Sequence, residues 1–154
     1  MKIYLKYLWY VLRHKWYVFD ECCKERMFLR GLFHDMSKFL PSEFIPYAKW
    51  FYGEYGVKFK NSEFDNNSML VINKEYQEVK RNFDLAWLKH QNRNPHHWQY
   101  WLLLKNSGEE EKIPMDYKYL FEMVCDWKGA GKAINGNTII TRSQETDYPY
   151  ITYK

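Results

Sequence analysis

Gly31-Leu32-Phe33-His34-Asp35-Met36-Ser37-Lys38-Phe39 places a histidine, a carboxylate and a lysine on about one turn of an otherwise apolar segment. We interpret it as part of a helix from about Phe28 to Phe39, with Asp35 and Lys38 on one face and His34 beside them. Burying such polar groups among apolar side chains is costly unless they bind something. The stretch therefore predicts a metal site in a helical protein.

Length and composition favour one folded domain. The chain has 154 residues, and its 7 Trp, 14 Tyr and 10 Phe argue against disorder because each buried ring removes a large apolar area from water. The formal net charge of +4 is mild and favours anionic ligands only weakly. Nucleic acid is an unlikely partner because no Gly-rich or basic-aromatic module is present.

The cysteines and the N-terminus point to a cytoplasmic protein. Cys22, Cys23 and Cys125 lack C-x-x-C spacing, and the adjacent pair is poorly placed to form a disulfide, so we expect reduced thiols. The apolar residues 1–19 are interrupted by four lysines and arginines, and no small-residue cleavage site follows. We therefore expect neither a signal peptide nor a membrane span, and no membrane partner.

Apolar periodicity predicts an all-α fold, a single compact helical domain of about six helices over residues 1–136. Pro41 is expected to end the second helix, and Ser42 is expected to cap the third. Pro46 is expected in the first turn of the third helix, and Gly129 is expected to break the last helix. The expected helices span residues 2–24, 28–39, 43–52, 74–91, 95–104 and 114–127.

Three segments lack this periodicity. Residues 54–73 are expected to form a long loop, either a binding element or a variable insertion. Residues 109–112 are expected to form a solvated loop. The tail, residues 137–154, is irregular and could be a short strand pair or an extended strap.

The histidines fall on or beside apolar stripes of the expected helices. His14 follows Val11 by three residues and precedes Val18 by four, and His90 is the last inward residue of its helix. For a single histidine such as His14, a buried ring bonded to a backbone or Tyr partner is the alternative. Taken jointly the candidate ligands are His14, His34, Asp35, His90, His96, His97 and Asp126. Imidazole and carboxylate together suit Mn, Fe, Co, Ni, Zn or Mg.

The order of these residues resembles the HD-domain phosphohydrolase superfamily, an all-helical, metal-dependent group. His34-Asp35-Met36-Ser37-Lys38 is similar to its H-D-x-x-K variant, and His96-His97 with Asp126 is similar to its cyclic-dinucleotide phosphodiesterase branch. The G-Y-P element of that branch is replaced by Trp98-Gln99-Tyr100, and Lys38 replaces the carboxylate of nucleotidase members. Only the metal-site residues carry over, and the substrate does not.

A more specific resemblance is to an uncharacterised domain-of-unknown-function family found in bacteria and their phages. It is carried by Pro41-Ser42-Glu43-Phe44, by residues 96–101 and by Asp126-Trp127, and it covers Met1 to about Ile134.

The superfamily resemblance implies one or two divalent ions. The first would lie on His34, Asp35 and Asp126 with His14, and a second on His90 with His96 or His97. Such ions activate a water and polarise a phosphoryl oxygen, so the implied reaction is hydrolysis of a nucleotide or another small phosphoester.

The same resemblance implies roles for three further groups. Asp35 or Asp126 would orient the nucleophile, and Lys38 and Arg93 would neutralise the non-bridging phosphoryl oxygens. An ordinary surface lysine and a solvated helix-terminus arginine are the alternatives. A non-catalytic regulatory protein that binds a metal or nucleotide remains the competing hypothesis.

Overall fold

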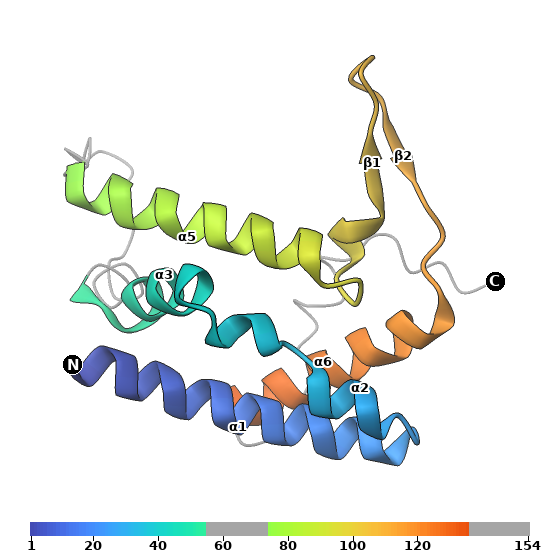
Figure 1. Cartoon of the computed structure of the whole chain (residues 1–154), viewed down its shortest axis with the longest axis horizontal. Coiled ribbons are helices and arrows are strands. Elements are labelled where there is room, and N and C mark those ends of the chain that lie inside the picture. The colour runs from blue at the N-terminus through green and yellow to red at the C-terminus, as the bar shows by residue number, and fades with distance from the viewer. Residues whose placement is uncertain (55–73, 136–154) are drawn as a thin grey trace. The chain divides into compact units, whose positions relative to one another are not determined.

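The structure is a computed structural model that describes residues 1–54 and 74–135. These residues form five α-helices, two short 3-10 helices and one β-hairpin (Figure 1), which confirms the predicted all-α class. The elements are α1 Lys2–Lys24, α2 Phe28–Phe33, η1 Met36–Phe39, α3 Pro41–Tyr52, α5 Lys74–Arg93, η2 Trp98–Trp101, β1 Leu102–Leu104, β2 Glu110–Lys112 and α6 Tyr117–Asn135. The predicted loop beyond Glu54 and the predicted tail lie outside the described residues.

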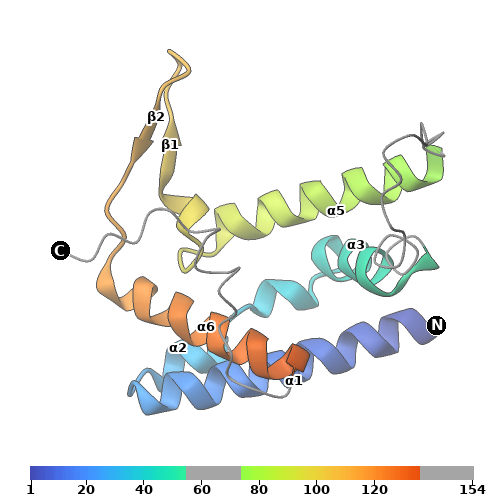
Figure 2. The ribbon, with the colours of Figure 1, turned by 180° about the vertical axis from the view of Figure 1, so that it is seen from behind.

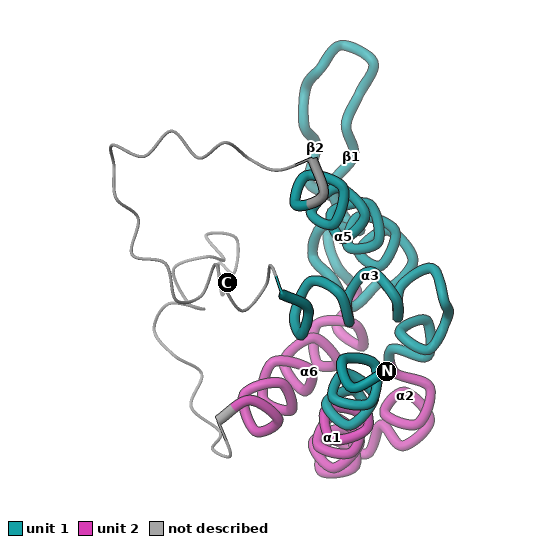
Figure 3. Tube along the Cα trace, turned by 90° about the vertical axis from the view of Figure 1, so that its left-hand side faces the viewer, with its two compact units in different colours: residues 1–11, 35–115 teal, residues 12–34, 116–154 magenta. Residues whose placement is uncertain are grey.

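The chain divides into two compact units (Figure 3). Unit 1 contains residues 1–11 and 35–115, and unit 2 contains residues 12–34 and 116–154. The chain passes from one unit to the other inside α1, at the bond between His34 and Asp35, and after Met115.

The core of unit 1 lies between the first half of α1, α3 and α5. Tyr47 is central to it, because its ring centroid lies 6.0 Å from that of Tyr7 and 5.2 Å from that of Phe83. The buried members are Tyr7, Val11, Tyr47, Ala48 and Ala86. This packing holds α3 alongside α5 and so brings their polar residues face to face.

The core of unit 2 depends on close helix contacts. Val18, Cys22 and Cys125 are buried where α6 packs on the second half of α1 (Figure 2). A Cβ atom on Gly129 would lie 2.7 Å from the backbone nitrogen of Val18, and one on Gly31 would lie 2.8 Å from Cβ of Cys22. Both positions therefore need glycine for the helices to approach.

The predicted continuous helix from Phe28 to Phe39 is wrong. α2 ends at Phe33, His34 is extended with ψ 131°, and Asp35 adopts the left-handed conformation with φ 53° before η1 begins. Asp is among the few residues that tolerate this conformation. Contrary to the prediction, Asp35 and Lys38 therefore do not share a face of one α-helix, although they form an ion pair.

The start of α3 also differs from the prediction. The helix begins at Pro41, because proline suits the first helical position, where no intrahelical N–H donor is lost. Leu40 rather than Ser42 occupies the cap position, and Pro46 lies inside the helix rather than in its first turn. The predicted end at Gly53 is confirmed, and α5 ends at Arg93, slightly later than predicted.

The predicted helix over residues 95–104 is wrong as well. Leu102–Leu104 pairs antiparallel with Glu110–Lys112, so part of the predicted solvated loop is an exposed strand. Gly108, with φ 85°, supplies the turn of this hairpin. α6 continues through Gly129, where a break was predicted, and the close contact with Val18 leaves no room for a side chain at this position.

Candidate metal centres

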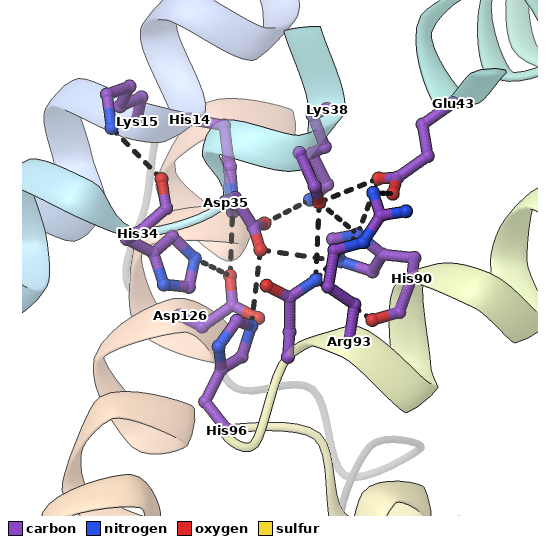
Figure 4. A network of polar contacts seen from close by, with 12 residues as sticks. His14, Lys15, His34, Asp35, Lys38, Glu43, His90, Arg93, His96 and Asp126 are labelled. Atoms are coloured by element: carbon purple, nitrogen blue, oxygen red, sulfur yellow. Dashed lines mark hydrogen bonds and ion pairs between the residues drawn. The ribbon is translucent and has the colours of Figure 1, made fainter. Parts of the chain in front are cut away.

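In unit 1 two histidines meet one buried aspartate (Figure 4). Oδ1 of Asp35 lies 3.4 Å from Nε2 of His90 and 3.3 Å from Nε2 of His96. The ring of His97 adjoins them, with its centroid 4.8 Å from that of His90. Ligand atoms of all four residues lie within 4.8 Å of one another, so this cluster can hold a metal ion.

Local backbone geometry assembles the unit 1 cluster. His90 lies in the last turn of α5, and the backbone N–H of Asn94 donates to the carbonyl oxygen of His90 at 3.1 Å. The amide of His97 then donates to the carbonyl of Asn94 at 3.0 Å. This turn leads the chain back, so that His96 reaches the same carboxylate as His90.

Glu43 orients the ring of His90 by contacting its Nδ1 atom, while Nε2 faces Asp35. Its Oε2 lies 2.9 Å from Nδ1 of His90 and accepts the hydroxyl of Ser37 at 2.8 Å, while Arg93 donates to its Oε1 at 2.6 Å. A carboxylate at Nδ1 selects the tautomer that carries its proton there, which leaves Nε2 as a lone-pair donor. That Nε2 atom is buried and forms no hydrogen bond within the described part of the chain, as a metal-ligand nitrogen requires.

Glu43 itself is fully buried. Burial raises the pKa of its carboxyl, but the contacts with His90, Ser37 and Arg93 outweigh burial and hold the pKa below its usual value. Glu43 is therefore an ionised acceptor, which the orienting contact with the imidazole requires.

A lysine contacts the same aspartate. Nζ of Lys38 lies 2.6 Å from Oδ2 of Asp35, and the lysine side chain is only 12% exposed, so it is not an ordinary surface lysine. The buried hydroxyls of Tyr7 and Tyr47 have no hydrogen-bond partner among the described residues. Arg93, the other predicted phosphate contact, pairs with Glu43.

Unit 2 repeats the central arrangement. Oδ1 of Asp126 lies 3.2 Å from Nε2 of His14 and 3.3 Å from Nε2 of His34 (Figure 4). All three residues are buried, and they come from α6, α1 and the end of α2. Their ligand atoms also lie within 4.8 Å of one another, so they too can hold a metal ion.

A second glutamate orients His34. Oε1 of Glu122 lies 3.2 Å from Nδ1 of His34, and its Oε2 accepts Arg30 at 2.8 Å. The guanidinium of Arg30 also lies over the ring of Tyr119, 4.5 Å from its centroid. His34 thus presents Nε2 to Asp126 for the same reason that His90 presents its own to Asp35.

Asp126 is ionised in this buried setting. Burial raises the pKa of its carboxyl, but the contacts with His14 and His34 outweigh burial and hold the pKa well below its usual range. One carboxylate and two imidazole nitrogens are a donor set suited to Zn, Mn, Fe, Co or Ni.

The structure distributes the predicted ligands over two clusters. Asp35, His90, His96 and His97 belong to unit 1, and His14, His34 and Asp126 belong to unit 2.

Sequence analysis missed both orienting glutamates. Glu122 precedes Asp126 by four residues on one helix, a spacing that could have identified it. Glu43 lies in the stretch Pro41-Ser42-Glu43-Phe44 that carries the resemblance, but no spacing indicated its role, because its partner His90 lies on another helix.

The family described as "Family of unknown function (DUF5662)" matches residues 4–151, so the chain belongs to this family. Neither the curated proteins nor the solved structures include a match. Within the described ranges no helix has the length and apolar character needed to cross a membrane.

Proposed function

We propose that this member of the DUF5662 family is a metal-dependent phosphohydrolase that acts on a nucleotide or another small phosphoester. One observation carries the proposal. In each unit, two imidazole Nε2 atoms lie 3.2 to 3.4 Å from a single oxygen of a buried aspartate.

Burial makes a cation the natural occupant of such clusters. An ionised carboxylate is costly to bury unless a counter-charge compensates it, and an Nε2 atom that presents its lone pair to the carboxylate supplies none. A divalent ion would supply the counter-charge and accept the lone pairs, with His14, His34 and Asp126 in one cluster and Asp35, His90, His96 and His97 in the other.

The reaction class follows from the ligands and from Lys38. A bound divalent ion lowers the pKa of water and polarises a phosphoryl oxygen. The ammonium of Lys38 forms an ion pair with Asp35 in the structure. With substrate bound, it would bind a non-bridging phosphoryl oxygen and neutralise its charge. Asp35 would orient the attacking water, and Arg93 remains a predicted contact of the same phosphate.

One observation favours a second candidate function. The side chains of His14, His34, His90 and His96 are all buried, so a substrate has little open access to their nitrogens. A protein that holds its metal for a structural or regulatory purpose, without turnover, is the alternative that this burial supports.

Metal loading and turnover separate these functions. The chelator-treated protein should bind Mn, Co, Ni, Zn or Mg and then hydrolyse nucleotides or an aryl phosphate, and Asp35→Asn and Asp126→Asn should abolish the turnover. Lys118→Met, which changes a lysine that pairs with Asp116, is the matched control. Stoichiometric metal without turnover would support the regulatory alternative, and absence of metal binding would reject both.

A further inference from the structure

One face of α1 exposes a stripe of large apolar side chains. Leu5, Trp9, Leu12 and Trp16 are between 45% and 66% exposed and recur at steps of four, three and four residues. The spacing places them along one side of the helix, while Tyr7 and Val11 are buried on another. We call these four residues the α1 stripe.

α2 extends the apolar surface within unit 2. A groove of about 300 Å³ is lined by Leu12, Lys15, Trp16, Phe19, Gly31 and Leu32, so α1 and α2 border the same hollow. Phe28, Leu29 and Phe33 of α2 are each more than half exposed. Exposed apolar side chains that gather around a groove in this way favour an interaction site.

The part of α1 that carries the stripe is basic up to Phe19, and the first acidic residue, Asp20, pairs with Lys24. Residues 1–19 contain Lys2, Lys6, Arg13 and Lys15 and no Asp or Glu, so this segment alone carries a formal charge equal to the +4 of the whole chain. At 100° per residue, Lys2, Lys6 and Arg13 fall on one flank of the stripe. Tryptophan and leucine beside such a basic flank are typical of helices that lie on anionic lipid.

We propose that the α1 stripe and the adjoining groove dock the protein on an anionic lipid surface. Trp9 and Trp16 would enter the headgroup region, while the basic flank pairs with lipid phosphates. A second copy of the chain is a poorer occupant, because it would bring one basic flank against another. The expectation of no membrane partner rested on the absence of a span, which peripheral binding does not need.

Vesicle flotation tests the proposal. With EDTA present to exclude metal-mediated capture of lipid phosphate, the protein should float with phosphatidylcholine vesicles that contain phosphatidylglycerol and not with pure phosphatidylcholine. Trp9→Gln with Trp16→Gln should abolish flotation. Lys2→Gln, Lys6→Gln and Arg13→Gln should each weaken binding by about fivefold, from about 1 kcal/mol per basic residue.

Matched controls lie elsewhere on the surface. Leu104→Gln changes an exposed leucine of β1, and Lys80→Gln changes an exposed lysine of α5, and neither should alter flotation. Because the changed side chains are exposed, or half-buried in the case of Arg13, circular dichroism should report an unchanged fold.

Three results would overturn the proposal: no preference for anionic vesicles, equal flotation of the stripe variants, or a dimer in light scattering that the tryptophan substitutions dissociate. The last would assign the stripe to a second copy. None of these results bears on the proposed hydrolase, since metal is absent throughout.

Discussion

The two polar clusters follow the same plan. In unit 1 the contacts run from Arg93 through Glu43 and His90 to Asp35, which also contacts His96. Each contact has its counterpart in unit 2, where the order is Arg30, Glu122, His34, Asp126 and His14.

The clusters differ in how they are built and in their charge. In unit 2 Glu122 and Asp126 share α6, whereas in unit 1 Glu43 and Asp35 lie on either side of η1. In unit 1 a lysine also contacts the aspartate. The comparison teaches that packing can produce one constellation twice without a sequence repeat, and that the unit 1 cluster already contains a cation where a metal would add another.

Removing either aspartate should have the largest effect. We expect Asp126→Asn to weaken one metal site by more than about 100-fold, because a primary ligand should count for at least as much as a residue that only orients one. Asp35→Asn should do the same for the other site. Elemental analysis after dialysis should show each variant retaining metal in the unaltered cluster. Loss of all metal from either single variant would break the comparison, since the clusters would not then act separately.

The orienting glutamates come next. Glu43→Gln and Glu122→Gln should each weaken metal binding by about 10- to 100-fold, because the imidazole loses the partner that fixes its tautomer. Competition titration against a chelator measures this loss. Glu111→Gln, at an exposed position of β2, is the control. Equal affinities in all three variants would mean that the glutamates only stabilise the fold.

Lys38 sharpens the difference between the units. Lys38→Met should raise the metal affinity of the unit 1 cluster by about tenfold or more, because a positive charge next to its ligand is removed. The unit 2 cluster should keep its affinity, and phosphohydrolase turnover should fall. The same titration, run in the Asp126→Asn background, isolates the unit 1 site. A weaker unit 1 site would contradict the assigned electrostatics.

Sequence periodicity predicted α1, α3, α5 and α6 because their buried faces repeat every three or four residues. It failed at residues 34–35 and 95–104, where single backbone conformations decide the path. Neither the left-handed Asp35 nor the turn after α5 leaves a periodic trace. The predicted helix over residues 95–104 would have required continuous helical hydrogen bonds from residue to residue. The turn after α5 forms other backbone hydrogen bonds instead.

The candidate ligands could be predicted because histidine and aspartate are costly to bury and rare on apolar faces. The resemblance also predicted two sites, but it did not predict that Asp35 contacts His90 and His96, because those contacts depend on how the chain packs. Glu43 and Arg93 were not assigned to each other, because a contact 50 residues apart in the sequence comes only from the packing of α3 on α5.

A smaller, pH-dependent effect on folding stability is expected from the ion pairs that Glu21 forms in unit 2. Burial raises the pKa of the Glu21 carboxyl, but Lys132 and Lys24 outweigh it and lower the pKa in the folded state. A lowered folded pKa stabilises the fold above the unfolded pKa, and this stability is lost as the pH falls through the folded value. Glu21→Gln should therefore flatten the acid side of the stability curve in chemical denaturation. An unchanged slope would contradict this.

The smallest effect is expected in unit 1. Lys80 and Asp84 form an ion pair in which both side chains are about half exposed, so solvent screens it. Lys80→Met should change the free energy of unfolding by less than about 0.5 kcal/mol. Thermal unfolding of the Lys80→Met and Glu21→Gln variants at neutral pH compares the Lys80–Asp84 pair with the ion pairs of Glu21. A larger loss from Lys80→Met would reverse the assigned order.

The residue at position 35 meets two separate demands: its backbone adopts the left-handed conformation, and its side chain is a candidate metal ligand. A saturation library at this position, screened only for folded protein, should return Gly, Asn and Asp, the residues that tolerate a φ of 53°. Screened for metal retention, the same library should return Asp alone. Gly and Asn clones would then report the demands of folding, and their absence from the second pool would report those of the metal.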